Sequence, residues 1–151
     1  MDKIGHLTRH SLLVAACLGA LAASGLPGLS FAGGNATESA NKKVVADFIA
    51  SWNDPDKAVG FLASDASVRM VEDQPAVVGP AAIGAAFKSF LTPGVTLTVK
   101  TLDTTVYGPV VTNRRIDTLK TAGKPDQVFR VVGVFVVKDG KIKEWTDYLE
   151  K

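Results

Sequence analysis

Two ionisable side chains, two residues apart in an apolar stretch, are the first feature of this sequence that could carry chemistry. From Val110 to Lys120, β-branched or apolar residues alternate with polar ones, a pattern typical of a β-strand. Side chains repeat every two residues along a strand, so Arg115 and Asp117 share one face, which has apolar residues at both ends. Charged groups in such surroundings are costly unless they are paired. Arg115 and Asp117 therefore form either a structural ion pair or the wall of a polar site in an apolar pocket.

A second carboxylate, Asp147, lies on the last predicted strand, about Lys141 to Tyr148. If the strands pair in sequence order, the strand between the two carboxylates carries Gly133, which leaves room between them. Two aspartates with Arg115 between them in an apolar hollow could act as acid and base, because such surroundings push paired pKa values apart. A structural alternative stays open, in which Arg115 and Asp117 form an ion pair and Asp147 is an edge charge.

The N-terminal segment, residues 1–32, has the pattern of a secretory signal peptide. Lys3 and Arg9 precede an apolar run from Ser11 to Leu26, and Ser-Phe-Ala ending at Ala32 fits a cleavage site. We expect cleavage after Ala32 and export to the periplasm or the medium, with no membrane association of the mature protein. An uncleaved anchor is the less favoured alternative, because the apolar run is shorter than the ~20 residues that a spanning helix needs.

Cleavage would remove the only cysteine, Cys17, and both histidines, His6 and His10. The mature protein would then lack the imidazole base of Ser-His-Asp and Cys-His catalysis and the usual zinc ligands. We therefore expect no metal and no cofactor. The chain has 151 residues with 17 basic and 15 acidic side chains, which suits one globular domain and gives no reason to expect nucleic-acid binding.

The rest of the chain predicts helices first and strands afterwards. We expect a flexible linker over residues 33–37 and one domain over residues 38–151. The predicted helices run from Thr37 or Ser39 to about Trp52, from about Asp56 to Leu62, and from Pro80 to about Leu91. The predicted strands are approximately Ala66–Val71, Val95–Tyr107, Val110–Lys120, Gln127–Val137 and Lys141–Tyr148. This order indicates an α+β fold in which a curved antiparallel sheet wraps over about three helices and leaves an apolar pocket between them.

Four short motifs in the C-terminal half resemble one known family when they are taken together. They are Arg-x-Asp at Arg115, Val-Val-Gly-Val-Phe ending at Phe135, Asp-Gly-Lys-Ile ending at Ile142, and Trp-Thr-Asp-Tyr ending at Tyr148. In this order they resemble limonene-1,2-epoxide hydrolases, which belong to the cone-shaped, nuclear transport factor 2-like or polyketide cyclase-like superfamily. The resemblance covers roughly the whole mature domain.

The resemblance implies a one-step opening of an epoxide to a diol without a cofactor or covalent intermediate. Asp147 would take a proton from water, Asp117 would protonate the epoxide oxygen, and Arg115 would link the two. The substrate would be small and apolar, and a homodimer is expected because family members often pair. The expected pocket residues are Val71, Leu119, Phe129, Val131, Phe135 and Trp145.

One part of the family pattern is absent. The family positions water with a tyrosine and an asparagine just ahead of a Met-Pro pair, and Pro75 here places Val71 and Asp73 at those positions. Asp73 can accept a hydrogen bond from water, but Val71 can form none. Two alternatives therefore stay open: a non-catalytic module that binds a lipid or terpenoid, and a ketosteroid isomerase-like isomerase or cyclase that uses Asp147 as a base.

Overall fold

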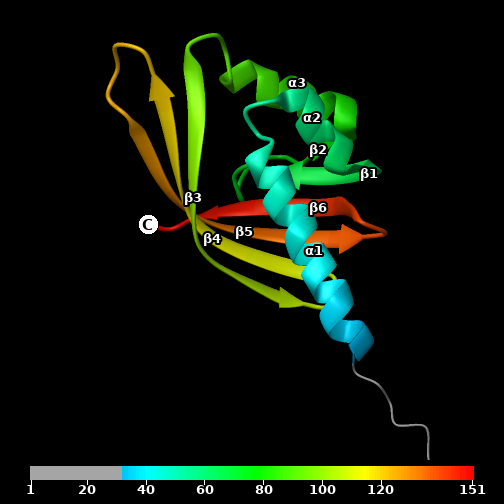
Figure 1. Cartoon of the computed structure of the whole chain (residues 1–151). Helices are drawn as coiled ribbons and strands as arrows, with labels where there is room; N and C mark the ends of the chain where they lie inside the picture. The colour runs from blue at the N-terminus through cyan, green and yellow to red at the C-terminus, as the bar shows by residue number, and fades with distance from the viewer. Residues whose placement is uncertain (1–31) are drawn as a thin grey trace, which may run out of the picture.

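Residues 32–151 are described by a computed structural model, in which one curved sheet carries the helices on its concave side (Figure 1). The strands are β1 (Leu62–Arg69), β2 (Val77–Val78), β3 (Val95–Tyr107), β4 (Val110–Thr121), β5 (Gln127–Lys138) and β6 (Lys141–Leu149). The helical elements are α1 (Ala32–Ala50), α2 (Pro55–Ala58), η1 (Val59–Phe61) and α3 (Pro80–Phe90). The predicted signal peptide, apart from Ala32, lies outside the described residues.

The six strands have the order β2-β1-β6-β5-β4-β3. The neighbours from β3 to β6 are antiparallel and joined by short turns, as the alternating sequence pattern predicts. The α+β fold class is confirmed, but the sheet is mixed, because β1 pairs in parallel with β6. That pairing joins distant parts of the chain, which local alternation does not encode. The short strand β2 was not expected, and it pairs with β1.

Helix α1 begins earlier than the sequence predicts. It starts at Ala32, so residues 33–37, where we expect a linker from the sequence, lie within its first turns. Its C-terminal half carries the predicted apolar stripe, in which Val45, Phe48 and Ile49 are buried against the sheet. Helix α2 follows after a turn, and the Asp54 carboxylate caps it by accepting a hydrogen bond from the Lys57 N–H at 3.1 Å.

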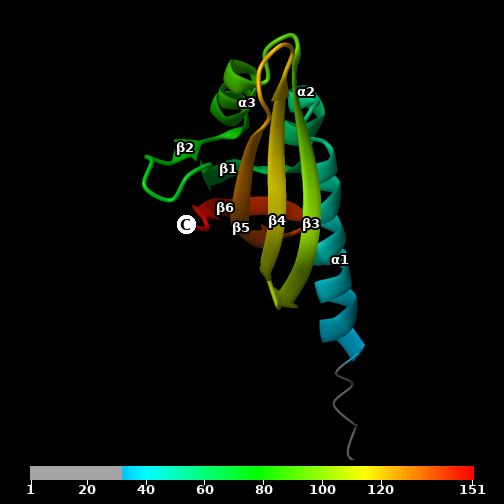
Figure 2. The same cartoon turned by 90° about the vertical axis from the view of Figure 1, so that its left-hand side faces the viewer.

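A cluster of aromatic rings holds the helices against the last two strands. The Phe48 ring centroid lies 5.7 Å from that of Trp52, 6.3 Å from those of Phe87 and Phe135, and 5.5 Å from that of Trp145. All five side chains are buried. Aromatic pairs of this kind each contribute about 0.5–1.5 kcal/mol beyond the burial of their area. The cluster therefore fixes β5 and β6 relative to α1, which lies along one side of the sheet in Figure 2.

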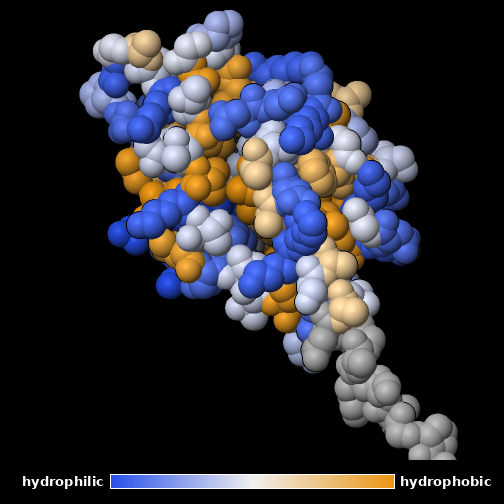
Figure 3. Space-filling view, viewed as in Figure 1, coloured by the Kyte–Doolittle hydropathy of each residue, from blue (hydrophilic) through white to orange (hydrophobic). Residues whose placement is uncertain are grey.

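The surface differs between α1 and the sheet. Hydrophilic side chains run along the outer side of α1, whereas apolar side chains gather over the strands beside it (Figure 3). The exposed apolar residues include Val128, Phe129 and Leu149 near the ends of β5 and β6. No helix within residues 32–151 has the length and apolar character that crossing a membrane requires.

Candidate active site

The sheet register brings the three predicted catalytic side chains together on its inner face. Strand β5 lies between β4 and β6, so Gly133 pairs with Asp147 on one side and with Asn113 on the other. Arg115 follows Asn113 by one inward-facing position on β4, and Asp117 follows Arg115 by one more. The exposed fractions of Arg115, Asp117 and Asp147 are 0%, 7% and 6%. The alternative in which Asp147 is an edge charge is therefore wrong.

Arg115 bridges the two carboxylates. Its Nε donates to both Oδ1 and Oδ2 of Asp117 at 3.0 Å, and its Nη2 donates to Oδ2 of Asp147 at 2.5 Å. The indole Nε1 of Trp145 donates to the other oxygen of Asp147, also at 2.5 Å. Charge-assisted hydrogen bonds of this kind are short and directional. We refer to Asp117, Arg115 and Asp147 as the Asp-Arg-Asp triad.

Aromatic and backbone groups enclose the guanidinium. The Cζ atom of Arg115 lies 4.8 Å from the centroid of the Trp52 ring, within the range of a cation–π contact. On the sheet side, a Cβ atom added to Gly133 would lie 2.4 Å from Arg115 Nη1 and 3.0 Å from Asp147 Oδ1. Gly133 is thus a glycine because the guanidinium occupies the space that a side chain would take.

Burial changes the proton affinity of both carboxylates. Desolvation raises the pKa of Asp147 to about 6, although hydrogen bonds from Arg115 and Trp145 act in the opposite direction. Desolvation also raises the pKa of Asp117 and outweighs the attraction of Arg115. Two aspartates that share one cation would carry a net negative charge in a dry site, so the pair favours holding one proton. This is the electrostatic condition that paired acid–base chemistry needs.

Asp117 and Asp147 form part of the wall of an apolar cavity of about 230 Å³, which we refer to as the acidic cavity. Five of the six predicted pocket residues line it: Val71, Leu119, Phe129, Val131 and Trp145. The cavity is also lined by six residues that are not among the expected pocket residues: Trp52, Met70, Phe87, Phe90, Leu97 and Leu149. The two aspartates are the only ionisable groups among these described lining residues.

Two predicted site residues lie elsewhere. Phe135 is fully buried in the aromatic cluster, where it stacks on Trp145 at a centroid distance of 5.8 Å, so its prediction as a pocket residue is wrong. Asp73 is exposed and does not line the acidic cavity. It lies in the turn after β1, where the Gln74 N–H donates to the Val71 carbonyl at 3.0 Å. The turn leaves Val71 at the cavity and carries Asp73 away from it.

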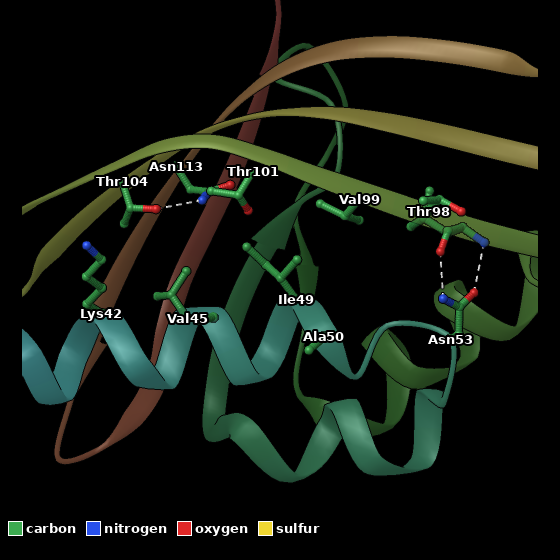
Figure 4. A pocket seen from close by; sticks show the side chains of 12 residues that line it. Lys42, Val45, Ile49, Ala50, Asn53, Thr98, Val99, Thr101, Thr104 and Asn113 are labelled. Atoms are coloured by element: carbon green, nitrogen blue, oxygen red, sulfur yellow. Dashed lines mark hydrogen bonds between the residues drawn. The ribbon is translucent and has the colours of Figure 1, made fainter.

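A larger hollow of about 560 Å³ lies between α1 and β3, and we refer to it as the α1–β3 groove (Figure 4). Its described lining residues include Lys42 and several threonines but no acidic side chain. At one end, Asn53 holds the edge strand: its Nδ2 donates to the Leu97 carbonyl at 2.6 Å, and the Leu97 N–H donates to its Oδ1 at 2.8 Å. Leu97 borders both hollows. Of the two hollows, only the smaller one has carboxylates among its described lining residues.

The sequence pattern predicts the burial of some of the cavity residues that were not expected to line a pocket. Trp52, Phe87 and Phe90 belong to the apolar faces of the helices, so their burial was predictable. Which of them faces a hollow depends on how the helices cross the sheet. Among residues 32–151, no three His, Cys, Asp or Glu side chains lie close enough to hold a metal ion.

Comparisons with known proteins agree with this architecture. The SnoaL-like domain family matches residues 45–145. A similar solved structure, described as an LEH-like epoxide hydrolase of M. tuberculosis, has a TM-score of 0.67 at 24% sequence identity and covers 75% of this chain and 84% of that chain. No curated protein matches the chain. At this identity, the structural likeness establishes the fold. The family match over most of the described domain, with this shared fold, shows that the chain belongs to the SnoaL-like family of the nuclear transport factor 2-like superfamily.

Proposed function

We propose that the protein hydrolyses a small apolar epoxide to a diol in one step of general acid–base catalysis. The observation that carries this proposal is the Asp-Arg-Asp triad, in which one buried guanidinium donates to two buried carboxylates that line the acidic cavity. The fold that the chain shares with an LEH-like epoxide hydrolase supports the proposal. Hydrolysis of this type needs an ionised base and a protonated acid on either side of one bound substrate.

We assign the base to Asp147 and the acid to Asp117. Both oxygens of Asp147 accept hydrogen bonds, one from Arg115 and one from Trp145, and this pattern suits the ionised carboxylate. Asp117 receives a single donor, Nε of Arg115, shared between its two oxygens. Burial raises the pKa of Asp147 to about 6 and thereby favours its protonation, but the two donors aimed at Asp147 favour the charge there once the pair holds one proton.

The proposed step balances without any further reactant. Asp147 takes a proton from water as the water oxygen forms a bond to one epoxide carbon. The bond between that carbon and the ring oxygen breaks, and the oxygen receives the proton of Asp117. Asp147 is then protonated and Asp117 ionised, so the proton must return from one to the other before the next turnover. Arg115 stabilises the negative charge on whichever carboxylate carries it.

The cavity restricts the class of substrate. Its volume of about 230 Å³ is below the usual range of ligand pockets, and apolar side chains form the rest of its described wall. A substrate with several polar groups would leave them without partners, which is unfavourable. The substrate should therefore be a small hydrocarbon epoxide whose ring oxygen faces Asp117.

The direct test is turnover by the purified chain against a panel of epoxides, with a gas-chromatographic assay for the diol. A single turnover in water labelled with heavy oxygen should place the label in the diol. Label that appears first on a protein carboxylate would contradict the one-step scheme. Diol formation by the Asp147→Asn variant at the wild-type rate would overturn the assignment of the base.

One observation favours a second candidate, a module that binds an apolar ligand without converting it. Val71 lies at the cavity where the family has a water-holding tyrosine, and Asp73 lies outside it. Among the described lining residues, the two aspartates are the only ionisable partners for water, and the indole N–H of Trp52 is a polar group without a partner. A Val71→Tyr variant separates the two functions: it should raise turnover in a hydrolase, whereas in a binding module it should only weaken the binding of a terpene such as limonene.

Export and homodimerisation are part of the same proposal. Residues 1–31 lie outside the described structure, so intact mass of the protein recovered from the periplasm or medium is the test of cleavage after Ala32. Light scattering of the purified chain tests the dimer. A cytoplasmic, uncleaved monomer would contradict both expectations.

A further inference from the structure

The guanidinium of Arg115 has one nitrogen, Nη1, that neither carboxylate uses. Its Nε and Nη2 donate to Asp117 and Asp147, whereas Nη1 has no hydrogen-bond partner among the residues that the structure describes. Arg115 is fully buried, so this donor has no direct access to solvent. A buried donor on a charged group is costly when it is unpaired, and native proteins rarely leave one in that state.

An unmatched acceptor lies on the same face of β4. Asn113 is 3% exposed, and its Nδ2 donates to Thr104 Oγ1 at 2.9 Å (Figure 4), but its Oδ1 has no partner within residues 32–151. Asn113 pairs with Gly133 in the register, and Cβ placed on Gly133 would lie 2.4 Å from Arg115 Nη1. The unmatched donor of Arg115 therefore reaches into the row of the sheet that Asn113 occupies.

A β-bulge in β3 gives the Asn113 amide a fixed orientation. The register of β3 shifts between Thr101, which pairs with Arg115, and Asp103, which pairs with Arg114. After this shift, Thr104 takes the position opposite Asn113, while Asp103 forms a surface ion pair with Arg114 at 3.1 Å. Because the Thr104 hydroxyl accepts from Nδ2, the carbonyl oxygen of Asn113 is directed away from Thr104 and is free to accept another donor.

We infer that Asn113 is a positioning residue of the Asp-Arg-Asp triad: its Oδ1 accepts a hydrogen bond from one of the two N–H groups of Arg115 Nη1, directly or through one water, and Thr104 orients it for that purpose. The guanidinium is then held at three corners by Asp117, Asp147 and Asn113, while Trp52 covers its face. A guanidinium held in this way cannot rotate when a proton moves between the carboxylates. Neither the family match nor the predicted site residues include this role.

The inference deepens the proposed function, because the kinetic value of a fixed guanidinium rests on acid–base catalysis by the triad. Its structural content does not depend on any substrate. In nitrogen NMR of the full chain, an arginine held at every corner gives separate signals for Nη1 and Nη2, because rotation about the Nε–Cζ bond is slow. The Arg115 signals are identified by their loss in an Arg115→Lys variant.

Four variants test the inference. Asn113→Leu removes the acceptor at similar volume, Asn113→Asp restores an acceptor, and Thr104→Val removes the group that orients the amide. Thr105→Val is the matched control, since Thr105 is the neighbouring threonine of β3 and its side chain is exposed. We expect the Arg115 signals to merge in Asn113→Leu, to broaden in Thr104→Val, and to stay separate in Asn113→Asp and Thr105→Val.

The outcomes separate a positioning role from one of filling space. A side chain that only fills an apolar gap should be replaced by leucine with less loss of order than by aspartate, the opposite of the expected result. Separate Arg115 signals in a folded Asn113→Leu chain would overturn the inference. If that variant does not fold, Thr104→Val decides, and unchanged Arg115 signals there would overturn it equally.

Kinetics then connect the inference to the proposed function. If the chain hydrolyses epoxides, Asn113→Leu should lower kcat roughly tenfold with KM nearly unchanged, because small displacements of catalytic groups are costly. Merged signals in the variant together with no turnover by the wild-type chain would refute the proposed function and leave the inference standing. Separate Arg115 signals in an Asn113→Leu chain that still hydrolyses epoxides would refute the inference and leave the proposed function standing.

Discussion

Two hollows lie on the helix side of one sheet, and they differ in what their walls can do. The acidic cavity is the smaller, at about 230 Å³, yet two buried aspartates lie in its wall, and the buried guanidinium of Arg115 joins them. The α1–β3 groove has about 560 Å³, and Lys42 is the single charged residue among those that line it in the described chain. The candidate active site is therefore identified by buried ionisable groups that lie close together, and not by the volume of the hollow.

The strongest test of this comparison is to remove charge from the acidic cavity. Asp147→Asn or Asp117→Asn should lower diol formation by about 10²–10⁴-fold, the usual contribution of a general acid or base. Each variant should keep the wild-type circular dichroism spectrum. Asp103→Asn is the matched control, because Asp103 pairs with Arg114 on the surface. A comparable loss in the control would show that the effect is not specific to the cavity.

A change of shape beneath the guanidinium should have the next largest effect. In Gly133→Ala the new Cβ would lie 2.4 Å from Arg115 Nη1 and 2.7 Å from the Phe135 ring, so the guanidinium must move. We expect a loss of about 1–3 kcal/mol in the free energy of unfolding, as for other overpacked cores, together with lost turnover. Gly60→Ala has open space around its Cβ and serves as the control in urea denaturation.

The pH dependence of turnover tests the electrostatics of the same cavity. Asp147 must be ionised to accept a proton, and its pKa is raised to about 6, so kcat/KM should rise with pH through this value. The rate should fall again where the coupled pair loses its remaining proton, because Asp117, whose pKa is raised by desolvation, can then no longer act as the acid. A flat rate profile between about pH 5 and 8 would contradict these assignments.

The free energy of unfolding should decrease as the pH rises, over the range in which the rate of hydrolysis increases. The pKa of folded Asp147, about 6, exceeds its ordinary value of 3.8, so the folded protein binds this proton more tightly than the unfolded chain. Its contribution to stability is complete below about pH 4 and is lost as the pH rises through 6, with a magnitude of about 3 kcal/mol. Urea denaturation should show this loss in the wild-type chain and a smaller loss in Asp147→Asn, where only Asp117 keeps a raised pKa.

The smallest effect is expected at Lys42, the charged residue of the α1–β3 groove. Lys42 is exposed on α1 and lines the α1–β3 groove, away from the triad. Lys42→Met should change kcat and KM less than about twofold, because surface substitutions rarely alter a distant site. A loss of turnover comparable to that in Asp147→Asn would show that the groove takes part in the reaction and would end the distinction between the two hollows.

Strand periodicity was sufficient to find the centre of the site. Arg115 and Asp117 alternate inward on one strand, and sequential pairing of β4, β5 and β6 then places Asp147 across Gly133. Each inference used only neighbours in the chain or in the hairpin order. The roles of these residues remain a proposal, but their meeting place follows from a pattern of period two.

The predictions were wrong where the position of a side chain depends on contacts between distant segments or on irregular backbone. Phe135 was assigned to the pocket because it alternates with pocket residues, but helix α1 covers it with Phe48. Asp73 was aligned with a water-holding asparagine, but the turn after β1 directs it outward. Thr104 pairs with Asn113 because of a β-bulge in β3, and the local residue pattern does not predict where such a register shift occurs.

The two hydrogen bonds between Asn53 and Leu97 have a consequence for how the molecule meets other chains. β3 ends the sheet, and a free edge of this kind invites strand addition by a second polypeptide. The Asn53 carboxamide presents a donor and an acceptor to the Leu97 backbone in the way that a neighbouring strand would. At this position the edge is already taken, so a chain that extends the sheet must first displace an amide fixed to the end of α1.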